Sequence, residues 1–120
     1  MGRARVAARV IEHPGVEDVS VQQVLEALSD PARRSVVRTL AHSMADLSCG
    51  SFDLPVGRST SSHHFSVLRE AGLLRQYYVG TTKMNALRSE ELERRFPGLL
   101  SAVVAAADAE VRDTSPPRPT

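Results

Sequence analysis

The chain has 120 residues, which is enough for one domain with a modest core, and its formal net charge at pH 7 is only +1. Its single cysteine excludes an internal disulfide framework, and no apolar stretch approaches the roughly 18 residues of a membrane span. Three arginines interrupt the apolar residues of the N-terminus, which therefore lacks a secretory signal, and we expect a cytoplasmic protein.

The charge is distributed unevenly along the chain. Residues 31–88 carry eight Lys and Arg against three acids, whereas residues 1–30 carry three bases against five acids and residues 89–120 carry four against six. A basic middle segment favours an anionic partner such as nucleic acid.

An N-terminal arm and two helices are expected first. Residues 1–19 form the arm, with a short helix over residues 3–11 that ends before Pro14-Gly15. Ser20 is a suitable N-cap for a helix whose apolar face holds Val21, Val24, Leu25 and Leu28. Asp30-Pro31 ends this helix and begins a second one, which runs to about residue 42. The second helix is expected to bury Val36, Val37 and Leu40 and to expose Arg33, Arg34 and Arg38.

The next segment leads into a helix with two different sides. We expect a short helix at residues 47–52, a turn at residues 55–57, and then an amphipathic helix that ends at Ala71-Gly72. The packed side of the amphipathic helix holds Ser61, Phe65 and Leu68, and the opposite side is polar near its start. The pattern of helix, tight turn and second helix is typical of a helix-turn-helix unit.

Short polar side chains at a helix start suit the major groove of DNA. Arg binds guanine with two hydrogen bonds, Ser and Thr donate or accept, and the free amides of a helix N-terminus bind phosphate. The residues expected to contact DNA from this helix are Arg58, Ser59, Thr60, Ser62, His63 and Ser66. A merely solvated polar face is the alternative for such a helix in isolation.

A β-hairpin is predicted directly after this helix. Residues 73–79 and 83–87 favour strands, and Gly80-Thr81-Thr82 favours the turn between them. Such a hairpin is a wing, in which Arg75, Lys83 and the two threonines face phosphate or the minor groove and Tyr77 or Tyr78 packs inward. A hairpin that only caps the core is the alternative.

The C-terminal part is predicted to contain two helices and a tail. A short helix begins at Ser89 and ends near Phe96, and Pro97-Gly98 breaks it. Residues 99–111 form a helix that is apolar on nearly every side, which predicts burial against a second copy of the chain. Residues 20–112 thus form the domain with its dimerisation helix, and residues 113–120 form a disordered tail.

The runs VLEALSDPARRSVVRTLA, STSSHHFSVLREAGLL and YYVGTTKMNALR resemble the ArsR/SmtB family of winged helix-turn-helix repressors. The resemblance covers about residues 21–111 and implies a bacterial homodimer on a two-fold operator that is released by a metal ion or another inducer. Within the family, the chain is most similar to nickel-linked regulators.

The metal sites that the family implies are incomplete in this sequence. In the Leu-Cys-Val-Cys pattern of the family, aligned on Leu47, the two thiolate positions hold Ser48 and Gly50, and Cys49 falls between them as a small buried residue. The other family site needs a His on the last helix, where this chain has Asp108 and Glu110 but no His. His13 in the arm, with nearby carboxylates, is the remaining candidate ligand for nickel or zinc, and an exposed His before a turn is the alternative.

An enzyme is not expected. Ser61, Ser62 and His63 are adjacent in sequence, but adjacent helix positions point about 100° apart, and no orienting acid follows. The sequence therefore predicts a mainly α protein with a small β-hairpin, a homodimeric winged helix-turn-helix regulator that binds double-stranded DNA. The competing hypothesis is a winged-helix interaction module that needs a co-regulator protein for sensing or for DNA binding.

Overall fold

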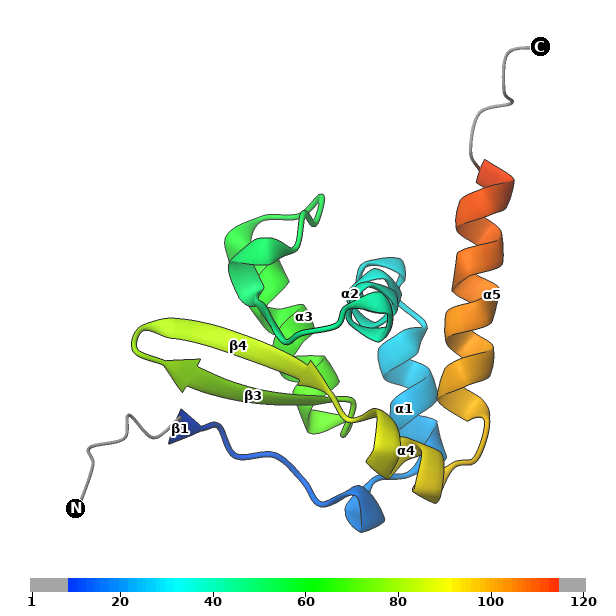
Figure 1. The fold of residues 1–120 in the computed structure, drawn as a ribbon, viewed down its shortest axis with the longest axis horizontal. Helices are drawn as coiled ribbons and strands as arrows, with labels where there is room; N and C mark the ends of the chain where they lie inside the picture. Colours follow the sequence, from blue (N-terminus) through cyan, green and yellow to red (C-terminus); the bar gives the residue numbers. More distant parts are fainter. Residues whose placement is uncertain (1–8, 115–120) are drawn as a thin grey trace.

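The computed structural model describes residues 9–114, which form a mainly helical domain with a small antiparallel sheet (Figure 1). Within these residues the helices are α1 (Val21–Leu28), α2 (Pro31–His42), α3 (Arg58–Glu70), α4 (Ser89–Arg95) and α5 (Leu99–Thr114). The strands are β1 (Arg9–Val10), β2 (Leu47–Ser48), β3 (Leu74–Val79) and β4 (Thr82–Leu87), in the sheet order β1-β3-β4-β2. Single 3-10 turns lie at Val16–Asp18 and Cys49–Ser51. None of the helices in this part of the chain is long and apolar enough to cross a membrane.

The predicted caps form at the starts of α1 and α2. Ser20 accepts a hydrogen bond from the backbone N–H of Gln23, whose side chain accepts one from the backbone N–H of Ser20, so the pair makes a capping box. Asp30 accepts from the backbone N–H groups of Ala32 and Arg33 at 2.8 and 3.2 Å, and Pro31 occupies the first turn of α2.

The core lies where α1, α2 and α3 meet one face of the sheet. The buried apolar residues of the three helices are Val24, Ala27, Leu28, Val36, Val37, Leu40, Phe65 and Leu68, and Leu73 and Leu74 join them at the start of β3. All three residues that were expected to be buried in α2 are buried. In α1, however, Val21 and Leu25 are each 45% exposed, because Ala27 instead turns inward beside Val24 and Leu28.

Two short strands replace parts of predicted helices. The helix expected over residues 47–52 forms only as the 3-10 turn at Cys49–Ser51, because the backbone of Leu47 and Ser48 pairs with Asn85 and Met84 at one edge of the sheet. The helix expected over residues 3–11 is wrong for residues 9–11, because residues 9 and 10 pair with Tyr78 and Tyr77 at the other edge and the N–H of Ile11 donates to the carbonyl of Gln76. The remaining part of that prediction, residues 3–8, lies outside the described residues. In both cases the open backbone groups of a hairpin edge bind a segment that has weak helical preference of its own.

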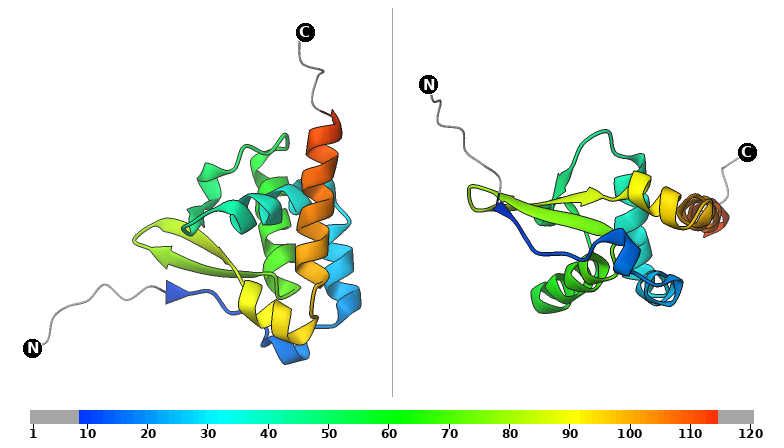
Figure 2. Two further views of the ribbon diagram at one scale, coloured as in Figure 1. Left: turned by 45° about the vertical axis from the view of Figure 1, so that its right-hand side comes forward. Right: turned by 90° about the horizontal axis from the view of Figure 1, so that it is seen from below.

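The C-terminal helices follow the prediction closely, except at the end. Gly98, with φ of +82°, links α4 to α5, and α5 packs against α2 and crosses it at a steep angle (Figure 2). Asp113 and Thr114 still belong to α5, so the expected tail is wrong for these two residues, and residues 115–120 lie outside the described part.

Candidate nucleic-acid interface

The start of α3 leaves its first backbone N–H groups open. Gly57 is the N-cap residue and supplies no side-chain oxygen, although its carbonyl accepts the N–H of Ser61 at 2.9 Å. The first turn holds no acidic residue. Unpaired amides and the positive end of the helix dipole therefore face outward at this point, where they favour an anion.

The predicted contact residues of α3 lie on its outer side. Arg58, Ser59, Thr60, Ser62 and His63 are exposed, and Ser66 is half-buried. Their side chains form no hydrogen bond or ion pair with any other part of residues 9–114. These six residues, here called the outer face of α3, are therefore available to a ligand.

An acidic residue lies beyond the outer face, at the C-terminal end of α3. Glu70 lies in the last turn of α3, where its side chain is 74% exposed and 4.0 Å from the guanidinium of Arg69. A carboxylate at this end of the helix disfavours the approach of a phosphate.

On its inner side, α3 is tied to α2 by buried polar groups. His64 is 7% exposed, and its Nδ1 accepts a hydrogen bond from Nη1 of Arg33 at 3.1 Å. Its Nε2 lies 3.8 Å from the carboxylate of Asp30. Burial raises the pKa of Asp30, but hydrogen bonds from the backbone N–H groups of Arg33 and Ala32, together with the nearby side chains of His64 and Arg33, outweigh this effect. The pKa of Asp30 therefore lies below its ordinary value.

The arginines of α2 were expected to be exposed, and this was wrong. Arg33, Arg34 and Arg38 are half-buried, because each guanidinium binds a group of another helix or of the turn before α2. Arg33 donates to the carbonyl of Ala27 at 2.7 Å and Arg34 to that of Leu28 at 2.9 Å, so both close the end of α1.

A second buried polar chain ties α3 to the hairpin, and the sequence analysis missed it. Arg69 donates to the side-chain oxygen of Gln76, whose amide donates to Asn85 at 2.8 Å. Asn85 in turn donates to the carbonyl of Leu47 at 3.1 Å, and both amides also approach the sulfur of Cys49, at 3.8 and 3.3 Å. Gln76 and Asn85 are 0% exposed and face each other across β3 and β4. The sequence did contain a signal for this buried pair. Gln76 is two positions after Leu74, so in a strand both side chains lie on the same, inward face of the sheet.

The hairpin has the geometry of a wing. Val79 pairs with Thr82, and Gly80 adopts φ of +62° in the turn, a conformation that suits glycine. The alternation of side chains places Lys83 on the same sheet face as Asn85, toward α3, and Arg75 on the opposite face. The Arg75 guanidinium lies 4.8 Å from the centre of the Tyr77 ring. Of the two basic residues expected on the wing, only Lys83 shares a side with α3.

Both tyrosines of the hairpin are half-buried, and each has a polar partner. The hydroxyl of Tyr77 donates to the carboxylate of Asp46, and this hydrogen bond, with burial, raises the pKa of Tyr77 above its ordinary value of 10.0. The ring of Tyr78 lies between Arg9 of β1 and Lys83 of β4, at 4.9 and 5.7 Å. Residues 9 and 10 of the arm thus pair with the wing.

The described residues do not fit a metal site within one chain. No three His, Cys, Asp or Glu side chains gather in residues 9–114 in a way that could hold a metal ion. His13 is half-buried, and its ring nitrogen lies 3.0 Å from the carbonyl of Ile11. His42 and Asp108 do meet across α2 and α5, at 2.9 Å, but the third partner is the guanidinium of Arg38.

This contact also sets the charge state of Asp108. Burial raises the pKa of Asp108, but the hydrogen bonds from Arg38 and His42 and the charges of these two side chains lower it by more. The pKa of Asp108 therefore lies below its ordinary value of 3.8. The carboxylate therefore stays ionised and joins α5 to α2.

No protein-family model matches the chain, but two of its relatives are transcriptional regulators. It is 37% identical over 83 residues to the uncharacterized HTH-type transcriptional regulator YceK of Bacillus subtilis, covering 68% of this chain and 83% of that protein. It is 34% identical over 103 residues to the HTH-type transcriptional regulator Rv2034 of Mycobacterium tuberculosis, covering 79% and 95%. Among solved structures, an ArsR-like transcriptional regulator from Rhodococcus sp. RHA1 matches with a TM-score of 0.54 and 27% identity, over 78% of this chain and 87% of that one.

Proposed function

Since this chain belongs to the HTH-type transcriptional regulators and has an ArsR-like winged helix-turn-helix fold, we propose that it reads a two-fold DNA operator as a homodimer. The expectation that the protein is not an enzyme is confirmed by its relatives, which are transcriptional regulators. The observation that carries the proposal is the outer face of α3, whose polar side chains have no partner within the described chain. The DNA would lie in the cytoplasm, where we expect the protein to work.

Each side chain of the outer face has a defined role in the proposal. Arg58, Ser59 and Ser62 would reach base edges in the major groove, because they stand on the first turns of α3 and are exposed. Thr60, His63 and Ser66 flank them and would contact the neighbouring backbone or bases. The free N–H groups at the start of α3 would bind a phosphate.

Lys83 would add a phosphate contact from the wing. It lies on the sheet face directed to α3 and lines the same cavity as Arg58 and Ser62. A lysine at this place acts as a point charge and not as a reader of bases. Arg75 was predicted to contact phosphate or the minor groove as well, but it lies on the opposite face of the sheet, so we propose no DNA contact for it.

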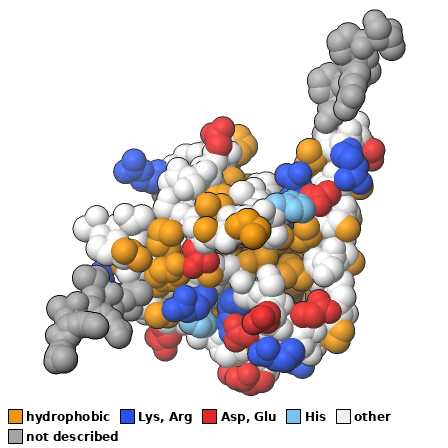
Figure 3. Space-filling model, in the orientation of Figure 1, with side chains coloured by type: hydrophobic (Ala, Val, Ile, Leu, Met, Phe, Trp, Pro, Cys, Tyr) orange, Lys and Arg blue, Asp and Glu red, His pale blue; other side chains and the backbone are white. Residues whose placement is uncertain are grey.

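A dimer is supported by the apolar surface beside α5. The side chains of Leu99, Val103 and Val104 are only partly buried, and Val111 is 45% exposed. In all views α1 lies beside the first half of α5, and its Val21 and Leu25 are 45% exposed (Figures 1 and 2). The space-filling view shows further hydrophobic side chains gathered between the wing and α5 (Figure 3). For the dimer to bind successive major grooves, this two-fold contact must place the two α3 helices about 34 Å apart, which is one helical turn of DNA.

A metal response is the least supported part of the sequence-based expectation. Because no complete ligand set forms within residues 9–114, nickel or zinc would need ligands from two subunits, with His13 as the candidate from the arm. Operator affinity measured with and without each metal, for the natural chain and for His13→Ala, tests this. The same affinity in all six conditions would remove the metal from the proposal.

The experiment that tests the proposed function is selection of bound fragments from a random-duplex library by the purified full chain. We expect a palindromic motif with half-sites one helical turn apart, and a complex that holds two chains in sedimentation analysis. Recovery of no motif, with binding that is equal for all duplexes, would contradict sequence-specific readout. It would favour the interaction module that needs a co-regulator protein.

A further inference from the structure

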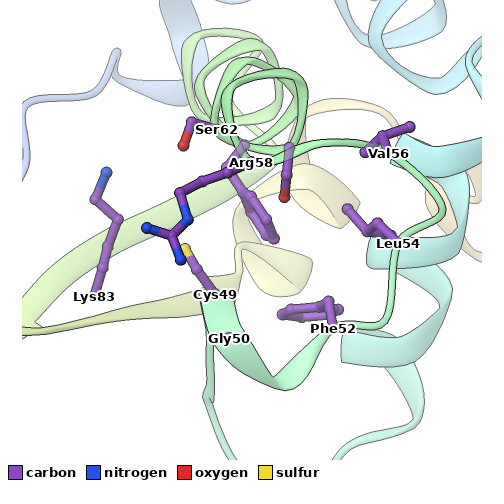
Figure 4. Close-up of a pocket in the computed structure, with 10 residues that line it drawn as sticks. Cys49, Gly50, Phe52, Leu54, Val56, Arg58, Ser62 and Lys83 are labelled. Carbon is purple, nitrogen blue, oxygen red and sulfur yellow. The ribbon is translucent and has the colours of Figure 1, made fainter.

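A cavity of about 400 Å³ opens beside the start of α3 (Figure 4). Its wall comes from three places: the 3-10 turn at Cys49–Ser51 with the loop after it, the first turns of α3, and Lys83 of the wing. The lining residues that matter below are Cys49, Phe52, Leu54, Arg58, Phe65 and Lys83. The volume lies in the range of small-molecule sites, which is about 300–1,000 Å³.

The two sides of this cavity differ in chemistry. On one side Arg58 and Lys83 approach from α3 and β4, and on the other side Leu54 and Phe52 form an apolar wall (Figure 4). Phe52 is held in place by an edge contact with Phe65, with ring centres 5.4 Å apart. A ligand that fits both sides carries an anionic group at one end and an apolar body at the other.

The charge on the cationic side is not balanced from within the described chain. None of the ten residues that line the cavity is acidic. Arg58 forms no ion pair in residues 9–114, and the Lys83 ammonium contacts only the face of the Tyr78 ring, at 5.7 Å. Two cations beside a partly apolar cavity repel each other, and a carboxylate between them would accept charge-assisted hydrogen bonds from both.

We propose that this cavity binds a small aromatic or aliphatic carboxylate, and that the ligand competes with DNA for Arg58, Ser62 and Lys83. The carboxylate would lie between Arg58 and Lys83, and the apolar body would lie against Leu54, Phe52 and Phe65. Competition follows because the same three side chains line the cavity and face the proposed operator. The ligand site stands on the cavity alone, whereas its regulatory consequence rests on the proposed function.

Binding can be measured without DNA, by using 1-naphthoate as a fluorescent probe of the full chain. We expect saturable binding of one molecule per chain, and binding about tenfold weaker for the neutral 1-naphthamide, which lacks charge-assisted hydrogen bonds. Equal binding of the amide, or no saturable binding of naphthoate, would overturn the proposal. Displacement of naphthoate by inorganic phosphate at the same concentration would also overturn it, because the cations would then form a plain phosphate site.

Cys49 reports where the probe binds, since it is the only cysteine of the chain and lines the cavity. Its alkylation by neutral iodoacetamide should slow in proportion to the fraction of bound naphthoate. An unchanged rate at saturation would place the probe elsewhere and contradict the proposal.

A variant of the apolar wall separates this site from the DNA contact. Leu54→Asn should weaken naphthoate binding and leave operator affinity unchanged, because Leu54 is half-buried and lies off the outer face. Lys83→Gln should weaken naphthoate binding as well, and it keeps the test valid if Leu54→Asn unfolds in circular dichroism. Unchanged naphthoate binding in both variants would overturn the assignment.

The competition is tested last, with the selected operator. Naphthoate should release the natural chain from the operator, and naphthamide should not. Release without protection of Cys49, or protection without release, would contradict the competition. If the chain selects no operator, the first two measurements still decide the ligand site, so failure of the proposed function and failure of this inference remain distinct.

Discussion

The two sides of α3 carry polar residues in entirely different states. On the outer side, Arg58, Ser59 and Ser62 are exposed and have no partner in the described chain. On the inner side, His64 is bound by Arg33, and Arg69 donates to the buried Gln76. The same helix therefore holds one set of polar groups that is free for a ligand and another that fixes the helix against α2 and the wing.

This difference separates residues that would govern DNA binding from residues that govern stability. Leaving a buried polar group without its hydrogen-bond partner lowers the free energy of unfolding, whereas removing an exposed polar side chain hardly changes it. Substitutions on the two sides of α3 should therefore affect different measurements. The predictions below test that separation in order of decreasing expected effect.

The largest effect should come from the apolar contact on the inner side. Phe65→Ala should lower the free energy of unfolding by about 3–4 kcal/mol, because Phe65 is 2% exposed and packs against Phe52. Ser62→Ala, one turn earlier and exposed, is the matched control and should change it by less than about 0.5 kcal/mol. Urea unfolding measures both. Similar losses in the two variants would contradict the separation.

The buried polar chain comes next. Asn85→Ala should cost about 2 kcal/mol in the free energy of unfolding, because it leaves the Gln76 amide and the Leu47 carbonyl without their partner. Gln76→Ala added to Asn85→Ala should cost less than Gln76→Ala alone, since the pair acts as a unit. Strictly additive losses in this double-mutant cycle would mean that the two amides act independently.

Removing the basic residue of the wing should lower the affinity of the protein for DNA but should not change its preference for particular base pairs. Lys83→Ala should weaken binding evenly across duplexes and reduce the slope of log affinity against log salt by about 0.9 for each subunit, as expected for one lost phosphate contact. The control is Arg94→Ala, which removes an exposed base of α4. A changed preference at a single base pair would show that Lys83 reads sequence.

The smallest effect concerns the contact of Asp108 with Arg38 and His42. Because the pKa of Asp108 lies below 3.8 in the folded chain, its contribution to stability is present above that pH and is lost as the pH falls through the lowered value. Asp108→Asn should therefore narrow the difference in unfolding free energy between about pH 6 and about pH 3. Asp113→Asn, at the exposed end of α5, is the control. An identical pH dependence in the natural chain and in Asp108→Asn would contradict the lowered pKa.

Local signals were sufficient to predict α2, α3 and the hairpin of the wing, but not the segment between α2 and α3. Asp30-Pro31 marks the start of α2. Gly72 and Gly80, which both adopt a positive φ in the structure, mark the end of α3 and the turn of the wing. These signals lie within a few residues of the features that they set. The bounds of α2 and α3 and the exposed outer face of α3 could therefore be predicted from sequence.

The rest depends on partners that are distant in sequence. β1 and β2 are each two residues long and exist because the edges of β3 and β4 accept them. Arg38 was predicted to be exposed because its partner, Asp108, lies 70 positions away. Gln76 and Asn85 look like ordinary strand residues until the register places them opposite each other. Hydrogen-bond partners of this kind cannot be identified from local spacing.

The central claim is that the outer face of α3 reads DNA sequence, and the most direct test is the base preference of Arg58→Ala. Its affinity, and that of Arg94→Ala, would be measured for every single-base variant of the selected operator. We expect Arg58→Ala to lose about 1–3 kcal/mol of binding free energy and its preference at one base pair in each half-site, while Arg94→Ala keeps both. An unchanged preference profile in Arg58→Ala would contradict the claim.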